Sequence, residues 1–274
     1  MSPEKRERIR EAVRFFYDLQ KLRIQMGNRA GSKTALFDDV DREFHEKRAK
    51  AMKALERAEL RNVERLCKES IIYPWLIEQR GIGPTLAGCI IAEVDIHRAE
   101  TVSALWKFAG LHTEGGKAVK RERGKRNEYN AWLRTKLVGV MADCMLKAGS
   151  EWRQYYDNMK HRRQHQLVKV CMGCDGTKKA KKGENKGKKC KNCGGTGGPA
   201  PWGESDGHRH RDAMRYMVKM FLQALWEEWR RREDLPVPED YKKAWLDREH
   251  GDHGGRPVKK PEKEEKSKAS KAAS

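Results

Sequence analysis

Several features that this sequence lacks narrow the class of protein. No apolar run approaches the roughly 20 residues that a membrane-spanning helix needs, and nothing in the chain resembles a signal peptide. Outside the cysteine-containing segment, no stretch alternates β-branched and polar residues over more than a few positions. We therefore expect a cytoplasmic protein without a membrane segment, whose fold is mainly α.

Acidic residues are also in deficit. The chain of 274 residues has 40 Asp and Glu against 60 Lys and Arg, which gives a formal net charge of +20. The isoelectric point is near 9.7. An excess of positive charge of this size indicates a polyanionic partner, of which nucleic acid is the commonest.

The cysteines predict a metal site and not disulfides. Their number, seven, is odd, and four of them form two C-x-x-C pairs, Cys171 with Cys174 and Cys190 with Cys193. The 15 residues between the pairs match a four-thiolate zinc ribbon, in which glycine-containing turns let two sulfurs converge on one ion. Two reactive dithiols are the alternative, but they would need a βαβ context that is absent. We expect a structural Zn²⁺, because four thiolates leave no position for an activated water.

Lysines crowd the segment between the two pairs and predict a flexible, positive fingertip on the ribbon. As nucleic-acid contacts from this segment we select Lys181, Lys182, Lys188 and Lys189.

A glycine-rich turn lies at Arg80-Gly81-Ile82-Gly83-Pro84-Thr85. The two glycines permit positive φ, and Pro84 is suited to the first turn of a helix, so one helix should end near Gln79 and the next begin at Pro84. Backbone N–H groups of such a turn and helix start can face one phosphate, as in a helix-hairpin-helix. Gly81, Gly83 and Thr85 are therefore candidate backbone contacts. The alternative is a glycine cap followed by an ordinary helix start, which needs no ligand.

Residues 115–126 form a second cationic stretch, with six basic residues and one acid. Its glycines deny it a stable fold of its own, so a solvated loop is one interpretation. Beside a phosphate-binding turn, we expect it to lie along a nucleic-acid backbone. The predicted contacts are Lys117, Lys120, Arg121, Arg123, Lys125 and Arg126.

The N-terminal part reads as two long helices. The first begins at the Ser2 cap and ends at Gly27-Asn28, and the second runs from Asp38 to about Ser70 without glycine or proline. An apolar stripe on the second helix, including Val40, Phe44 and Leu55, should pack against the first helix in an antiparallel hairpin or in the coiled coil of a homodimer formed through residues 3–70.

The remaining organisation follows from helical periodicity and composition. Further helices are expected over 127–147, 151–168 and 206–232. The predicted domains are a helical hairpin (1–70), a helical domain in two parts (71–168 and 204–248), an inserted zinc ribbon (169–203) and a charged, disordered tail (249–274).

Three segments, 81–93, 103–111 and 125–137, resemble in order and spacing the C-terminal transposase domain of the bridge-RNA-guided serine transposases of bacterial insertion sequences. The likeness continues at 151–156 and resumes at 210–219. It implies a helix-hairpin-helix domain, duplex DNA or a structured RNA as partner, and a bacterial nucleoid or phage-infected cell as location. The two cysteine knuckles also resemble the repeats of the DnaJ co-chaperone zinc domain, which we take as shared knuckle geometry only.

Two departures from that family bear on activity. Its members place a serine nucleophile shortly after the segment matching residues 109–111, whereas residues 112–116 here read His-Thr-Glu-Gly-Gly. They also carry an N-terminal RuvC-like domain with acidic metal ligands, whereas residues 1–70 read as helices. We therefore expect a non-catalytic, transposase-derived protein that binds duplex DNA, with Thr113 as the remaining candidate nucleophile.

Two other functions stay open. One is an active recombinase, transposase or nuclease that uses Thr113 or the acids Glu93, Asp95 and Glu114. The other is an RNA-binding scaffold that dimerises through its helical hairpin.

Overall fold

The computed structural model describes residues 1–31, 38–114, 117–121, 124–182 and 184–237. Met1–Pro236 form one compact unit. The tail predicted at 249–274 and the end of the last helical segment, 238–248, lie outside the described residues. The prediction of a mainly α fold is confirmed, and no described helix is long and apolar enough to cross a membrane.

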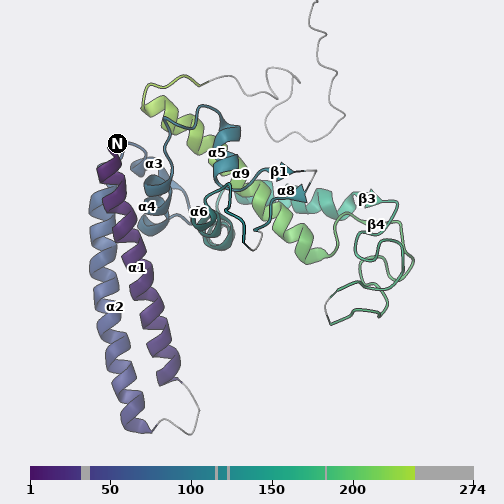
Figure 1. The fold of residues 1–274 in the computed structure, drawn as a ribbon, viewed down its shortest axis with the longest axis horizontal. Helices are drawn as coiled ribbons and strands as arrows, with labels where there is room; N and C mark the ends of the chain where they lie inside the picture. Colours follow the sequence, from purple (N-terminus) through teal and green to yellow (C-terminus); the bar gives the residue numbers. More distant parts are fainter. Residues whose placement is uncertain (32–37, 115–116, 122–123, 183, 238–274) are drawn as a thin grey trace, which may run out of the picture. The chain divides into compact units, whose positions relative to one another are not determined.

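The N-terminal helices α1 (Pro3–Ala30) and α2 (Asp39–Cys67) form an antiparallel hairpin (Figure 1). Its direction follows from two ion pairs, Lys5 with Glu69 and Arg23 with Glu56, because the partner's residue number falls as the residue number rises along α1. The predicted end of α1 at Gly27 was wrong. The helix continues to Ala30 because one glycine costs a helix only about 1 kcal/mol.

Only one end of the hairpin is well buried. Val63, the last residue of the predicted packing stripe, and Cys67 are in the core, whereas the earlier stripe residues are exposed, with Val40 at 74% and Leu55 at 50%. The expectation that this stripe packs against α1 is therefore wrong for these positions.

Helix α4 (Pro84–Glu93) is the centre of the core, and a turn joins it to the short helix α3 (Tyr73–Glu78). Every α4 residue from Leu86 to Ala92 is buried. The hairpin approaches α4 so closely at Gly88 that a Cβ there would lie 2.8 Å from Val13 Cγ2 and 3.1 Å from Val63 Cγ1. The helical hairpin and the domain that follows thus share one core.

Short elements follow in chain order: α5 (Val102–Phe108), β1 (Thr113–Glu114), β2 (Lys117–Ala118), α6 (Ala131–Lys136), the π-helix η1 (Leu137–Met141) and α7 (Ala142–Lys147). Strands β1 and β2 pair antiparallel. The helix predicted from 127 starts instead at Ala131, because the Asn130 side chain accepts a hydrogen bond from Leu133 N and caps it there.

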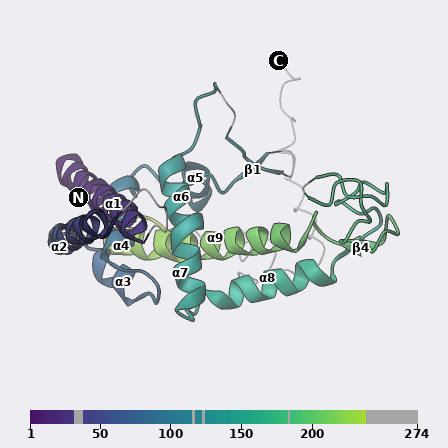
Figure 2. The same ribbon diagram turned by 90° about the horizontal axis from the view of Figure 1, so that it is seen from below.

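The last long helix, α9 (Asp206–Arg232), lies along α8 (Arg153–His165), and α6 and α7 cross it (Figure 2). Phe221 of α9 is fully buried between Trp75, which stacks on it, and Trp152, which meets it edge to face. Strands β3 (Leu167–Val168) and β4 (Ala200–Pro201) pair antiparallel and close the base of the cysteine segment.

Candidate nucleic-acid interface and metal centre

The two glycines of the α3–α4 turn have different roles. Gly81 has φ of +92°, and a Cβ there would lie 2.8 Å from the backbone N and Cα of Met145 on α7. It is therefore needed for packing inside the protein. Gly83 has φ of −98°, an ordinary extended value, and a Cβ there would meet nothing within 4 Å. Of the two glycines, only Gly83 therefore borders open space in front of α4.

The start of α4 has no side-chain cap, and one cation, Lys136, lies near it. The Thr85 hydroxyl is a hydrogen-bond partner of Tyr17 on α1. Lys136 Nζ lies 3.0 Å from the centroid of the same tyrosine ring, and burial lowers the pKa of this ammonium group. Arg14 lies over the Trp132 ring at 5.9 Å. Sequence reasoning missed these residues, because they come from α1 and α6 and form no run.

The second predicted contact region surrounds a small cavity of about 190 Å³. Lys120, Lys125 and Arg126 line it, together with Val119, Tyr129 and the acids Glu114 and Glu128. Lys120 and Arg121 are exposed. Arg123 lies outside the described residues, and only the backbone of Lys117 is described.

The four predicted metal ligands come together. Their sulfurs all lie within 4.8 Å of one another, with Cys171 Sγ 3.9 Å from Cys190 Sγ and Cys174 Sγ 3.7 Å from Cys193 Sγ. A tetrahedral ion held by four sulfurs at about 2.3 Å needs neighbouring sulfurs about 3.8 Å apart. The cluster therefore fits a metal ion bound by four thiolates.

The two cysteine knuckles have the same backbone geometry. Thr177 N donates to Cys174 O, and Thr196 N donates to Cys193 O. In each knuckle, the threonine hydroxyl also donates to the carbonyl that its own backbone N–H contacts. Positive φ values at residues that follow each pair, among them Gly176 and Gly194, let the chain turn sharply enough for this.

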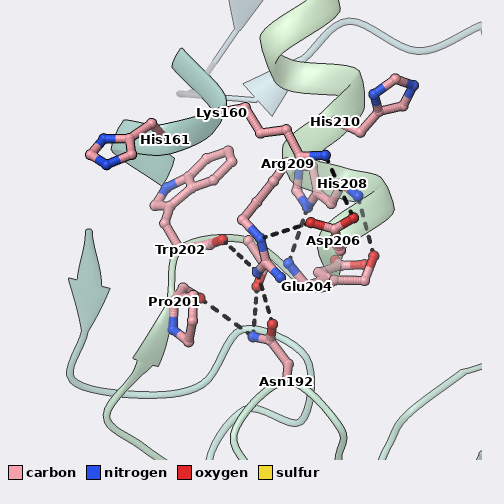
Figure 3. Close-up of polar contacts among 12 residues, drawn as sticks. Lys160, His161, Asn192, Pro201, Trp202, Glu204, Asp206, His208, Arg209 and His210 are labelled. Atoms are coloured by element: carbon pink, nitrogen blue, oxygen red, sulfur yellow. Dashed lines mark hydrogen bonds and ion pairs between the residues drawn. The ribbon is translucent and has the colours of Figure 1, made fainter. Parts of the chain in front are cut away.

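Asn192 and Arg209 connect the cysteine cluster to α9 (Figure 3). The Asn192 amide nitrogen lies 3.5 Å from Cys171 Sγ and also donates to Gly203 O at 2.9 Å. Arg209, buried at the start of α9, donates to Asn192 Oδ1 at 2.9 Å and to Trp202 O at 3.2 Å. Partners of this kind fix the orientation of a metal ligand. Sequence reasoning predicted the ligands and missed both of these residues.

The lysines of the fingertip lie on a hairpin between the knuckles. Its backbone is closed by Ala180 N donating to Lys188 O and by an antiparallel bridge between Lys179 and Lys189. Lys182, Lys188 and Lys189 are exposed, whereas Lys181 is partly covered and pairs with Asp175.

The candidate acids of an enzyme are mostly engaged in ion pairs. Glu93 pairs with Arg10 at 3.0 Å, and Asp95 pairs with Arg6 at 2.7 Å, which lowers the pKa of the Asp95 carboxyl. These contacts tie α1 to the end of α4. Thr113 and Glu114 are exposed on β1, where Glu114 lies 3.3 Å from the His112 ring. Within the described ranges, the cysteine cluster is the only group that could hold a metal through three or more His, Cys, Asp or Glu ligands.

The predicted contact regions are distributed along α9. The cysteine cluster contacts its first turns through Arg209, and the α3–α4 unit contacts its second half through Trp75 and Phe221. At about 1.5 Å per residue, this helix of 27 residues is about 40 Å long. The structure therefore does not bring the predicted contacts into one pocket.

A comparison with known families matches residues 75–157 to the model described as the transposase IS116/IS110/IS902 family. This segment is transposase-like. It spans α3 to the early part of α8, less than a third of the chain, and contains the α3–α4 turn and the basic segment. The earlier part of the resemblance in the sequence is thus confirmed at family level, while its continuation at 210–219 stays a prediction. No curated protein and no solved structure matches the chain.

Proposed function

We propose that this chain is a non-catalytic, transposase-derived protein that binds the backbone of duplex DNA. The observation that carries the proposal is the start of α4, inside the transposase-like segment. There Gly83 leaves open space in front of an uncapped helix N-terminus, and Lys136 lies nearby over the ring of Tyr17, the partner of Thr85. Free N–H groups and the helix dipole favour a phosphate at such a position.

The basic residues around the 190 Å³ cavity and the exposed fingertip lysines supply two further contacts with the backbone. These groups are spread along α9, which suits a long, uniform polyanion better than a small ligand. The proposed binding is therefore strongly dependent on salt and weakly dependent on sequence.

The proposed metal is Zn²⁺ with a structural role. Four thiolates at tetrahedral spacing favour zinc among biological ions and leave no position for a bound water. When bound, the ion would hold the two knuckles together and so position the lysine hairpin. Asn192 and the Gly197 N–H, each directed at a cysteine sulfur, would stabilise the thiolate charge.

Absence of strand cleavage is proposed because the available groups are poorly suited to it. Glu93 and Asp95 are neutralised by arginines, and the exposed Thr113 has no base placed against its hydroxyl among the described contacts. An active enzyme remains the alternative that a nuclease assay decides.

Homodimerisation through residues 3–70 is a further proposal. Its support is the exposed apolar stripe, in which Val40, Phe44 and Leu55 lack cover from α1. The same dimer would serve an RNA-binding scaffold, and competition between duplex DNA and RNA of equal length would separate these two partners.

Two measurements test the proposed function. Affinity for a duplex oligonucleotide should fall steeply with salt, and Gly83→Val should weaken it without unfolding the protein, because the added side chain projects into open space. Incubation of supercoiled plasmid with protein and Mg²⁺ should retard the plasmid without nicking it. Nicked plasmid would contradict the non-catalytic assignment.

A further inference from the structure

Two arginines from distant parts of the chain lie together beneath the β1–β2 hairpin. Arg134 is on α6 and Arg215 is on α9, and both are half-buried. Each is held by one backbone carbonyl: Arg134 donates to Val119 O at 2.9 Å, and Arg215 donates to His112 O at 3.5 Å. The carbonyls belong to the two segments that flank the hairpin.

No carboxylate pairs with either guanidinium in the part of the chain that the structure describes. The nearest acid in sequence, Asp212, lies one turn before Arg215 but binds Arg163 at 2.7 Å. Burial, and then the positive charge of Arg134, lower the pKa of Arg215. A guanidinium has five N–H donors, so most donors of both residues have no acceptor among the described residues.

The surroundings contain a further unpartnered polar atom. Nδ1 of His112 is buried without a hydrogen-bond partner, and His112 O is the carbonyl that Arg215 contacts. On the other side, the Arg134 guanidinium stacks over the Tyr129 ring at 5.0 Å. Tyr129 and Val119 also line the 190 Å³ cavity that Lys120, Lys125 and Arg126 surround. The arginine pair therefore adjoins a solvent-accessible, mostly cationic recess.

Among the residues that the structure describes, the only carboxylate that acts on Arg215 is Asp212, which is paired with Arg163. Two half-buried like charges without an ion pair of their own destabilise a fold, because burial removes hydration and each charge repels the other. An anion that accepts from both forks would supply what is missing. Phosphoryl oxygens match this geometry best, since guanidinium groups bind them through paired N–H donors.

We propose that Arg134 and Arg215 form a binding site for one phosphoryl group. The site deepens the proposed function and rests on it: its occupant is a phosphodiester of the bound nucleic acid, held at a fixed point between α6 and α9. A free phosphate would satisfy the same donors, so the test includes both sources.

The test compares Arg215→Met with Arg211→Met in the full-length protein. Both variants remove one positive charge from α9, but Arg211 is exposed and one turn away, so it controls for diffuse charge. Arg215→Lys keeps the charge and loses the planar fork. Each protein is assayed for affinity to a labelled duplex of random sequence at several salt concentrations. Its melting temperature is measured in pyrophosphate and in sodium chloride at matched ionic strength.

The site predicts that Arg215→Met weakens duplex binding about tenfold and reduces the salt slope by about 0.9, the value for one phosphate contact. Arg211→Met should change affinity by less than about twofold, because an exposed charge is well screened. Arg215→Lys should lie between the two. Pyrophosphate should raise the melting temperature of the wild type and of Arg211→Met but not of Arg215→Met. Without pyrophosphate, Arg215→Met should melt at or above the wild-type temperature.

The outcomes separate the two claims. If the duplex binds and Arg215→Met equals Arg211→Met in both assays, the site is refuted and the proposed function stands. If no protein binds duplex but pyrophosphate stabilises in an Arg215-dependent manner, the site holds a free phosphoryl anion and the proposed function falls. A large loss of melting temperature in Arg215→Met without pyrophosphate would show a structural role and overturn the proposal.

Discussion

The lysine hairpin of the cysteine segment and the Arg134–Arg215 pair are both cationic, but they differ in hydration. Lys182, Lys188 and Lys189 are exposed, so each keeps its water shell and is screened by salt. Arg134 and Arg215 are half-buried and form no ion pair with an acid among the described residues. The lysine hairpin therefore offers many weak contacts with a polyanion. The arginine pair offers one position where the electrostatic attraction for an anion is strong. Charge in a sequence shows where a polyanion can approach, and burial decides where it is held.

Removal of the metal should have the largest effect. It should disrupt the lysine hairpin and leave the Arg134–Arg215 pair in place. Cys190→Ser removes a ligand whose sulfur lies 3.9 Å from that of Cys171. We expect loss of bound zinc and unfolding of residues 171–203, because structural zinc supplies about 10 kcal/mol or more of local folding energy. The main core is a separate cluster of residues and should stay folded.

Zinc content and limited proteolysis would measure this. Cleavage confined to the fingertip region, with DNA binding weakened but still dependent on Arg215, is the expected result. A variant that unfolds throughout would show that the two clusters are one cooperative unit.

The paired glycines of the α3–α4 turn should show the next largest effect. Gly81→Ala places a Cβ 2.8 Å from the Met145 backbone at a positive φ, and should cost about 2–4 kcal/mol of stability. Gly83→Ala meets nothing within 4 Å, and at this N-cap position it should cost no more than about 1 kcal/mol of stability. Chemical denaturation of both variants measures the difference. Equal destabilisation would contradict the assignment of Gly81 to packing and Gly83 to the open side.

The link between the cysteine cluster and α9 should show a smaller effect. Asn192→Ala removes the amide directed at Cys171 Sγ and the acceptor of Arg209. Zinc affinity should fall about tenfold, as for other partners of metal ligands. Competition with a chelator measures this, and Lys191→Ala, at the exposed neighbour, is the matched control. Equal chelator resistance of the two variants would mean that Asn192 does not support the ligand.

Substitutions of single fingertip lysines should show the smallest effect. They test whether an exposed lysine contributes less to duplex affinity than the half-buried arginine pair. Lys188→Gln should change duplex affinity by less than about twofold, because a solvated charge gains little from one contact. Fluorescence anisotropy at one salt concentration suffices for this measurement. A loss as large as that expected for Arg215→Met would place the main contact on the hairpin instead.

Local signals predicted much of this molecule. Pro84 begins α4 as its fixed φ predicts. The C-x-x-C spacing correctly predicted that four sulfurs lie close together. The break of α1 at Gly27 was wrong because one glycine costs a helix only about 1 kcal/mol, too little to end it.

What the sequence could not reveal depends on contacts between distant residues. Arg134 and Arg215 belong to different helices, and neither lies in a basic run conspicuous enough to be selected. Likewise, the two glycines of the turn are equivalent in the sequence, and only the position of Met145 distinguishes them. The hydration and packing of single residues are therefore the properties that could be learned only from the three-dimensional structure.

The most direct test of the account is the salt dependence of duplex binding by the unmodified protein. If about 6 phosphates are neutralised, log K should fall with log salt at a slope near −5. A slope near zero, or no binding at modest ionic strength, would contradict the claim that this chain holds a nucleic-acid backbone.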